Sequence, residues 1–227
     1  MKHALNRLFA DDGRILIVAM DHTAFLNTTI DGLVNYERTV RSVVPAGADA
    51  FLSPLGSARA YQEAYGRAAI ICSVDPKGVA GQFAVDEAAR LGADAVKCMI
   101  YPFADDTVLN ESVGLAARAH AHGLPFLAEP IPGGFSNTDM RTPEIIAAGC
   151  RLSMEAGADI VKTFYPGTPE GMRKVIDYAG VPVVVLGGHK KDSLAALYQE
   201  TYVAVILGGA SGVAIGTNIW TSADPAG

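Results

Sequence analysis

The chain has 227 residues, 50% of them hydrophobic and 19% charged, which is enough for one domain with a large apolar core. Its formal net charge of −6 gives no support for nucleic-acid binding, which favours basic surfaces. The longest apolar stretch, 202–215, is too short and too rich in glycine to span a membrane, and no signal peptide is apparent at the N-terminus.

The cysteines and histidines show no metal-ligand spacing. Cys72, Cys98 and Cys150 are odd in number and far apart, which favours a reduced, cytoplasmic protein. The histidines are also scattered. The pair His120 and His122 falls at the end of a predicted helix, away from the carboxyl ends of the strands, where the active site is expected. We therefore interpret these two as surface residues and expect no metal site.

Short apolar segments alternate with helical patterns along the chain. The expected strands are 14–22, 48–54, 69–75, 93–102, 125–131, 158–164, 182–188 and 212–217. The expected helices are 34–44, 57–65, 85–91, 108–122, 143–156, 169–178 and 192–207. Glycines that are typical of helix C-termini precede several strands, at Gly47, Gly66, Gly92, Gly123, Gly157 and Gly180.

Eight strands with interleaved helices predict an α/β fold of the (β/α)8 TIM-barrel type, in a single domain over 1–227. The alternative is a doubly wound open sheet, which is less favoured because no GxGxxG motif follows the first strand. Few residues follow the eighth strand, so the final covering helix is expected to be absent. The flank left open favours a homo-oligomer.

Two lysines stand at equal offsets in two similar phrases, 92–97 (GADAVK) and 157–162 (GADIVK). The offset predicts that Lys97 and Lys162 occupy the same height and face of two strands in one sheet. A lysine inside an apolar strand is costly unless its charge is used or suppressed. The pair therefore predicts an enzyme that forms a Schiff base at a desolvated amine.

Glu129 lies on the strand between those of the two lysines, within 125–130 (PFLAEP). In the reading we favour, Lys162 is the nucleophile, Lys97 weakens its protonation by like-charge repulsion, and Glu129 carries protons. The alternative is a buried ion network that serves stability alone, although such networks seldom stabilise more than an apolar replacement does.

Asp21 closes the first strand and is predicted to face the same mouth, where it can orient substrate hydroxyls or the amine. Its alternative role is to cap the following loop. Strand alternation predicts that His22 points the opposite way, so we assign it no chemistry.

Glycines gather after the seventh and eighth strands, where barrels of this type bind phosphate. Gly187, Gly188 and Gly216, with Thr217, are the candidate phosphate-binding residues, since backbone N–H groups without bulky side chains can cradle an anion. The same glycines are also ordinary in tight turns.

Several segments resemble the DhnA-type (archaeal-type) class I fructose-bisphosphate aldolases over nearly the whole chain. They are 19–22 (AMDH), 159–163 (DIVKT), 187–188 (GG) and 209–219 (GASGVAIGTNI). The phrase 93–97 (ADAVK), with Tyr101 and Glu129, also resembles the tagatose-bisphosphate aldolases. The resemblance implies a Schiff base at Lys162, substrate and proton contacts at Asp21, and assisting roles for Lys97 and Glu129.

Two positions depart from the DhnA-type pattern. Ile131 stands where that family has a catalytic tyrosine, so Glu129 or another group must carry the proton. Thr217 stands where the family has a phosphate-binding arginine, which makes Arg141 and Lys190 candidates for that task.

The expected function is a class I aldolase without a metal or other cofactor, acting on a sugar phosphate in glycolysis and carbohydrate metabolism. Fructose 1,6-bisphosphate, cleaved to dihydroxyacetone phosphate and glyceraldehyde 3-phosphate, is the first substrate expected, and tagatose 1,6-bisphosphate the second. The alternatives are a transaldolase-like synthase, a thiolase for a phosphorylated diketone, and a non-catalytic barrel that binds a sugar phosphate.

Overall fold

Eight parallel strands form a closed barrel in the computed structural model, which describes residues 5–23, 29–75, 79–188 and 190–226. Each strand pairs with its neighbours in chain order, and β8 closes the ring against β1. The strands are β1 (Ile15–Ala19), β2 (Ala50–Pro54), β3 (Ala69–Ser73), β4 (Ala95–Ile100), β5 (Phe126–Pro130), β6 (Ile160–Thr163), β7 (Val183–Leu186) and β8 (Gly212–Ile215). This topology confirms the predicted (β/α)8 barrel and excludes the open sheet.

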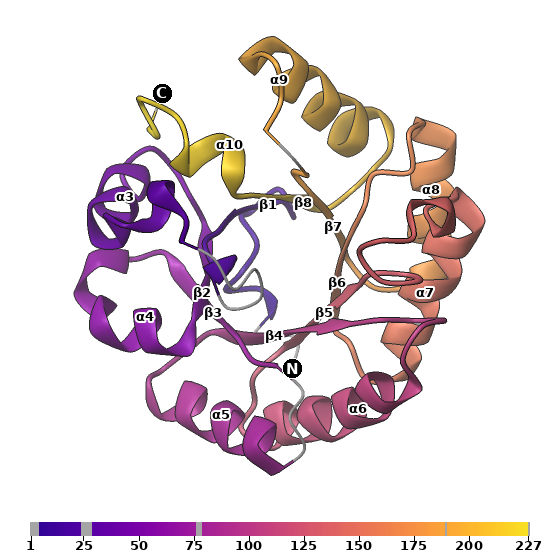
Figure 1. The fold of residues 1–227 in the computed structure, drawn as a ribbon, viewed down its shortest axis with the longest axis horizontal. Helices are drawn as coiled ribbons and strands as arrows, with labels where there is room; N and C mark the ends of the chain where they lie inside the picture. The colour runs from indigo at the N-terminus through magenta and orange to yellow at the C-terminus, as the bar shows by residue number, and fades with distance from the viewer. Residues whose placement is uncertain (1–4, 24–28, 76–78, 189, 227) are drawn as a thin grey trace.

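Helices surround the ring of strands on the outside (Figure 1). The α-helices are α3 (Tyr36–Val43), α4 (Leu55–Ala60), α5 (Val79–Arg90), α6 (Asp106–Ala121), α7 (Pro143–Glu155), α8 (Pro169–Ala179), α9 (Leu194–Tyr202) and α10 (Thr217–Trp220). Short 3-10 turns are η1 (Asp31–Leu33), η2 (Gln62–Tyr65) and η3 (Thr138–Met140), and η4 (Val203–Leu207) is a π-helical turn.

Local sequence explains where α7 and α8 begin and end. Thr142 and Thr168 each precede a proline and accept a hydrogen bond from a backbone N–H in the first helical turn. Gly180 ends α8 in the left-handed region, at a φ of 71°, where a side chain would be strained. Both helices lie within two residues of their predicted bounds because these signals act locally.

Three predicted helices differ from the structure. The helix expected at 85–91 begins earlier, at Val79, and the helix expected at 57–65 divides into α4 and η2. The helix expected at 192–207 starts at Leu194 and changes to the π-helical turn η4 after Tyr202. Apolar periodicity marks the buried face of a helix, but it does not distinguish α-helical from 3-10 or π-helical hydrogen bonding.

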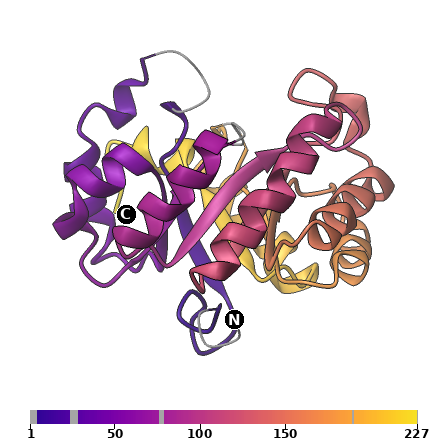
Figure 2. The same ribbon diagram turned by 90° about the horizontal axis from the view of Figure 1, so that it is seen from below.

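The inside of the barrel is apolar in its lower part. Inward-facing side chains from all eight strands form one buried cluster, which includes Ile17, Leu52, Ile71 and Val184. The N-terminal segment packs beneath this cluster and closes that end, with Leu8 buried among the strand residues. In Figure 2 the described residues before β1 lie at the bottom of the barrel, opposite the end where the loops after the strands gather.

A single helical turn, α10, follows β8 in the described part of the chain, so the structure has no full-length covering helix there. Trp220 anchors this turn by donating a hydrogen bond from Nε1 to the Ala19 carbonyl oxygen, at 3.1 Å. A groove of about 330 Å³ lies between α9, α10 and α3, and Val43, Leu197 and Ile219 contribute to its apolar lining. Within the described segments, no helix is both long and apolar enough to cross a bilayer.

Candidate active site

Polar side chains form a layer directly above the apolar interior of the barrel. Each is two residues beyond an apolar residue of the inner cluster, so strand alternation points both to the inside. The successive pairs are Ala19 and Asp21, Ile71 and Ser73, Ala95 and Lys97, Leu127 and Glu129, and Ile160 and Lys162. All five polar residues therefore stand at the carboxyl ends of the strands, where barrels of this type place their catalytic groups.

The strand register agrees with the predicted equal height of Lys97 and Lys162. Lys97 pairs with Leu127, and Leu127 pairs with Ile160, two residues before Lys162. In an eight-stranded barrel with a shear of eight, the register slips by about one residue per strand. Two strands therefore account for the offset of two residues, and the lysines share one layer of side chains.

Four charged side chains form a continuous network inside the mouth of the barrel. Lys97 Nζ lies 3.0 Å from Asp21 Oδ2 and 2.7 Å from Glu129 Oε2. Lys162 Nζ lies 2.7 Å from the other oxygen of Glu129, Oε1. All four residues are at least 94% buried, with exposed fractions of 1% for Asp21 and Lys97 and 6% for Glu129 and Lys162.

Opposite charges keep the network ionised in spite of burial. Burial opposes the charge of Asp21, but Lys97 and Lys162 outweigh it and lower the pKa of this carboxyl to about 2. The pKa of Glu129 is likewise lowered, since the two lysines overcome its desolvation. Burial disfavours the charged form of Lys97, yet Asp21 and Glu129 raise its pKa above the ordinary value.

The two lysines differ in how firmly they are held. Lys97 is clamped between two carboxylates and is almost fully buried, whereas Lys162 contacts the single carboxylate of Glu129. Deprotonation of Lys97 would therefore break two ion pairs, and deprotonation of Lys162 breaks one. Among the described residues, this asymmetry distinguishes the singly paired Lys162 from the doubly paired Lys97.

Ser73 is a member of the layer that the sequence pattern did not single out. Its hydroxyl donates to Asp21 Oδ2 at 2.9 Å, so Asp21 receives hydrogen bonds from both Ser73 and Lys97. The sequence signal was its position two residues after Ile71 in the expected strand 69–75, and in the structure Ser73 pairs in register with Lys97. A serine at a strand end is too common for that signal to have stood out.

His22 and Asp21 both follow the end of β1 at Ala19, and they have different neighbours, since Asp21 contacts Ser73 and Lys97. The ring of His22 lies edge to face with Trp220, at a centroid distance of 5.3 Å, and close against Gly216 at the end of β8. Burial lowers the pKa of His22 below its ordinary value, against the raising effect of the Asp21 charge. His22 therefore belongs to the wall of the mouth between β1 and β8.

The candidate phosphate-binding residues lie together at the ends of β7 and β8, but they are not equivalent. The Gly187 N–H donates to the Ala214 carbonyl oxygen in the sheet, at 2.9 Å, and is therefore already used. Gly216 is required by close packing, because a Cβ there would lie 2.5 Å from the Ala19 oxygen. Gly188 is exposed, with a φ of 63° and open space around its Cα. Thr217 is the first residue of α10.

A cavity of about 470 Å³ opens beside the mouth, between the loops that follow β6 and β7. Phe164 and Tyr165 line it from the β6 side, and Gly188 and Lys190 line it from the β7 side. Lys191 also lines the cavity, but its ammonium is paired with Glu200 at 2.7 Å.

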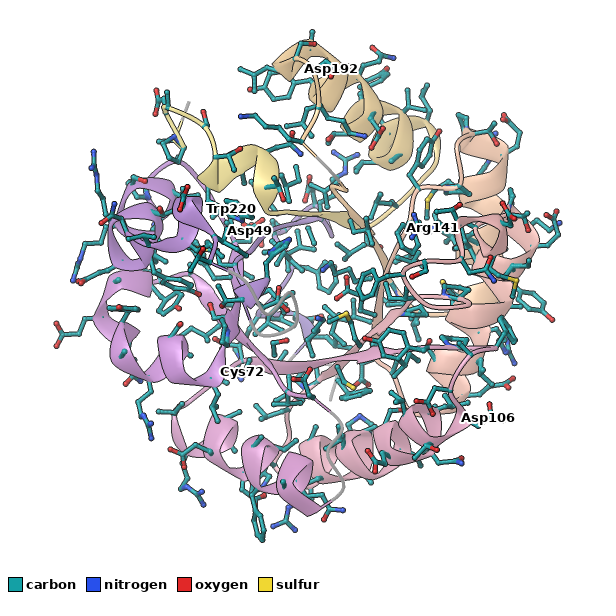
Figure 3. The ribbon with its side chains drawn as sticks, viewed as in Figure 1. Asp49, Cys72, Asp106, Arg141, Asp192 and Trp220 are labelled. Atoms are coloured by element: carbon teal, nitrogen blue, oxygen red, sulfur yellow. The ribbon has the colours of Figure 1, made fainter. Side chains whose placement is uncertain are left out.

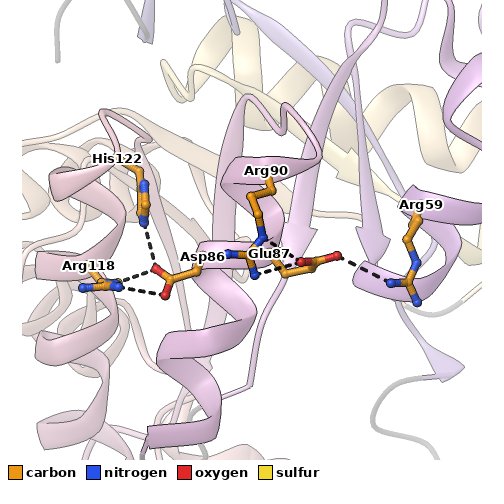
Figure 4. A network of polar contacts seen from close by, with 6 residues as sticks. All are labelled: Arg59, Asp86, Glu87, Arg90, Arg118 and His122. Atoms are coloured by element: carbon orange, nitrogen blue, oxygen red, sulfur yellow. Dashed lines mark hydrogen bonds and ion pairs between the residues drawn. The ribbon is translucent and has the colours of Figure 1, made fainter.

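The remaining histidines and cysteines lie away from this mouth. His120 pairs with Asp159 at 2.9 Å, and His122 contacts Asp86, which also holds Arg118 (Figure 4). The interpretation as surface histidines holds for His122, which is exposed, whereas His120 is half-buried; each contacts an aspartate. His3 and His189 lie outside the described residues. The three cysteines are free and buried, and no group of three or more candidate ligands among the described residues could hold a metal.

The family model described as "DeoC/LacD family aldolase" matches residues 15–222. The chain is 32% identical to a 2-amino-3,7-dideoxy-D-threo-hept-6-ulosonate synthase of Halobacterium salinarum, with 97% of this chain and 85% of that protein covered. It is 30% identical to a class 1 fructose-bisphosphate aldolase of Halobacterium salinarum, with 95% and 87% covered.

A solved structure agrees with these matches. An archaeal fructose-1,6-bisphosphate aldolase, with its catalytic lysine covalently bound to the carbinolamine intermediate, superposes with a TM-score of 0.84. It has 26% sequence identity to this chain, and the alignment covers 99% of this chain and 94% of that one. The resemblance noted in the sequence is thereby confirmed, and the chain belongs to the DeoC/LacD family of class I aldolases.

Proposed function

We propose that this protein cleaves and forms a ketose phosphate through a Schiff base at Lys162. The observation that carries this proposal is the asymmetry of the two buried lysines: among the described residues, Lys97 pairs with two carboxylates and Lys162 with one. Fructose 1,6-bisphosphate is the first substrate to test, since one similar protein and one similar structure carry that name.

Glu129 is the proposed proton carrier for the amine. Its Oε1 lies 2.7 Å from Lys162 Nζ, within direct transfer distance. When Lys162 gives up its proton, one of the two cations that lower the pKa of Glu129 disappears, so the carboxyl can hold that proton. The neutral amine then attacks the C2 carbonyl, and the proton returns to the carbinolamine hydroxyl, which leaves as water and yields an iminium.

The iminium then accepts the electrons of the bond that breaks. A carboxylate of the network removes the proton of the C4 hydroxyl, the C3–C4 bond cleaves, and its electron pair forms the enamine. The aldehyde product departs, C3 takes a proton, and water hydrolyses the iminium to release the second product and the free amine. Lys97 neutralises the two carboxylates while this charge moves, since it lies between them.

Borohydride trapping tests the proposal directly. The protein is incubated with dihydroxyacetone phosphate, reduced with borohydride and mapped by peptide mass spectrometry. We expect a reduced adduct on the peptide that contains Lys162, its loss in Lys162→Met, and its retention in Lys174→Met, which changes an exposed lysine on α8. An adduct on Lys97 instead would reverse the assignment, and the lack of any adduct would refute the Schiff-base mechanism.

A synthase is the second candidate, supported by the 32% identity to the heptulosonate synthase. Both activities would use Lys162, so trapping does not separate them. Acceptor dependence does, because an aldolase cleaves its ketose phosphate without a second substrate. Release of glyceraldehyde 3-phosphate from fructose 1,6-bisphosphate alone supports the aldolase, and turnover only with an added acceptor supports the synthase.

A further inference from the structure

Arg141 lies on the loop that connects β5 to α7, directly after η3. Its guanidinium carbon lies 4.2 Å from the centre of the Phe164 ring, and Nη2 donates to the Phe135 carbonyl oxygen at 3.1 Å. Figure 3 places Arg141 on the side of the molecule where β6, β7, α7 and α8 lie. The arginine therefore connects the loop after β5 with the end of the strand that carries Lys162.

The loop that carries Arg141 is held to the rim at its other end. The Gly133 N–H donates to the Pro102 carbonyl oxygen at 2.9 Å, just beyond β4. The ring of Phe135 meets Tyr101 edge to face, at a centroid distance of 6.2 Å. Contacts at both ends therefore position the guanidinium before any substrate arrives, which lowers the entropy that binding would cost.

Arg141 has unused hydrogen-bonding capacity. Its Nε atom is buried and has no hydrogen-bond partner among the described residues. Among the described residues, Lys191 of the cavity pairs with Glu200, whereas no carboxylate pairs with Arg141 or with Lys190, so these two are the candidate cations here. A buried N–H without a partner is rare in folded proteins and costs free energy, which a bound acceptor would recover.

The contact with Phe164 uses a face of the Arg141 guanidinium and none of its N–H groups. Phe164 occupies the face of the group, whereas phosphate and carboxylate bind arginine through the N–H groups in its plane. Phe164 stands two residues beyond Lys162, which is roughly 7 Å along an extended chain. Phe164 also lines the 470 Å³ cavity beside the mouth, so Arg141 stacks on a side chain that borders this space.

We propose that Arg141 binds the anionic group at the end of the substrate that is distant from the Schiff-base carbon. Arg141 would thereby determine specificity for a ketose with an anionic group at each end. The inference rests on the proposed function, because it takes Lys162 as the point of attachment. The anion is a phosphate or a carboxylate, and the arginine recognises either by the same paired hydrogen bonds.

Two ketoses that differ in one phosphate test the inference. Fructose 1,6-bisphosphate and fructose 1-phosphate are compared in wild type, Arg141→Met, Arg141→Lys and Arg173→Met, the last of which changes an exposed arginine on α8. We expect Arg141→Met to lower kcat/KM for the bisphosphate by about 10- to 100-fold and to leave the monophosphate nearly unchanged. Arg141→Lys should cause a smaller loss than Arg141→Met, since lysine keeps the positive charge but lacks the paired N–H groups of the guanidinium.

Equal losses on both substrates, or no loss, would overturn the assignment of Arg141. The same holds if Lys190→Met, rather than Arg141→Met, removes the preference for the bisphosphate.

A binding measurement separates this inference from the proposed function. Calorimetric titration of both sugars into Lys162→Met, with and without Arg141→Met, reports the anion contact without chemistry. A preference for the bisphosphate that depends on Arg141 supports the inference even if borohydride traps no adduct. A trapped adduct on Lys162 without such a preference supports the Schiff-base mechanism and refutes the role of Arg141.

Discussion

Two ion networks of similar composition occupy very different places in this barrel. In the mouth, Lys97 joins Asp21 and Glu129 with side chains that are 1% to 8% exposed. On the outside, Asp86 on α5 holds Arg118 through two hydrogen bonds and also contacts His122, and these two partners are 47% and 35% exposed (Figure 4). Each network holds a carboxylate at hydrogen-bond distance from a basic side chain, Lys97 inside and Arg118 outside.

The difference in solvent exposure determines what each network can do. Water and salt screen the outer network, so its partners can be exchanged at little cost. The inner network is buried, so each charge is stabilised by its neighbours and not by solvent. The removal of one side chain therefore destabilises the charges that remain. A chain of interdependent charges can pass a proton to a substrate, whereas a solvated ion pair mainly joins two helices.

The largest effect in this comparison is expected for Glu129→Gln. The amide keeps the shape of the side chain but can neither accept the Lys162 proton nor balance two lysines. We expect a loss of kcat of about 10²- to 10⁴-fold, the usual contribution of a positioned acid or base. Steady-state cleavage of fructose 1,6-bisphosphate measures it, with Glu144→Gln on the exposed start of α7 as the matched control. Equal activities of the two variants would contradict the proton role.

Lys97→Met should lower the free energy of unfolding strongly. The substitution leaves Asp21 and Glu129 buried with a missing cation, and breaking a buried pair in this way costs about 3–5 kcal/mol. Urea denaturation followed by circular dichroism measures the change. Asp21→Asn in the Lys97→Met background should recover part of the loss, since it removes one uncompensated charge. Strictly additive effects would show that the charges are not coupled.

The ionisation of Asp21 should make the free energy of unfolding depend on pH in the acid range. Its pKa of about 2 in the folded protein lies below the ordinary value of 3.8, so the carboxylate stabilises the fold above pH 4. This contribution, about 2 kcal/mol, should be lost as the pH falls from about 4 towards 2. Asp21→Asn should flatten the acid limb of the stability curve, while Asp177→Asn on the surface of α8 should keep it. An unchanged limb in Asp21→Asn would contradict this linkage.

The smallest effect is expected for Arg118→Met in the outer network. Its charge is close to solvent, so the loss in unfolding free energy should be well below that of Lys97→Met and should shrink further in 1 M salt. Urea curves of both variants at low and high salt provide the test. A large, salt-independent loss at Arg118 would remove the distinction between the two networks.

Much of the site could be predicted because strand alternation is a local property. The apolar neighbours two residues before Lys97, Glu129 and Lys162 already indicated that the three side chains point to one interior. Alternation could not foresee that His22 packs against Trp220 and Gly216, or that the Gly187 N–H is used by β8. Both outcomes depend on how β1, β7 and β8 meet when the barrel closes.

The eight strands, the capped starts of α7 and α8 and the inward direction of the charged side chains follow from local patterns, because periodicity and capping act over a few residues. The pairing of the charges depends on contacts between strands that are far apart in the chain. Asp21 reaches Lys97 across 76 positions of sequence, and this contact makes Lys97 the clamped lysine and leaves Lys162 with one partner. Closure of the barrel sets these distances. The low polarity of the interior makes the electrostatic interactions over these distances strong.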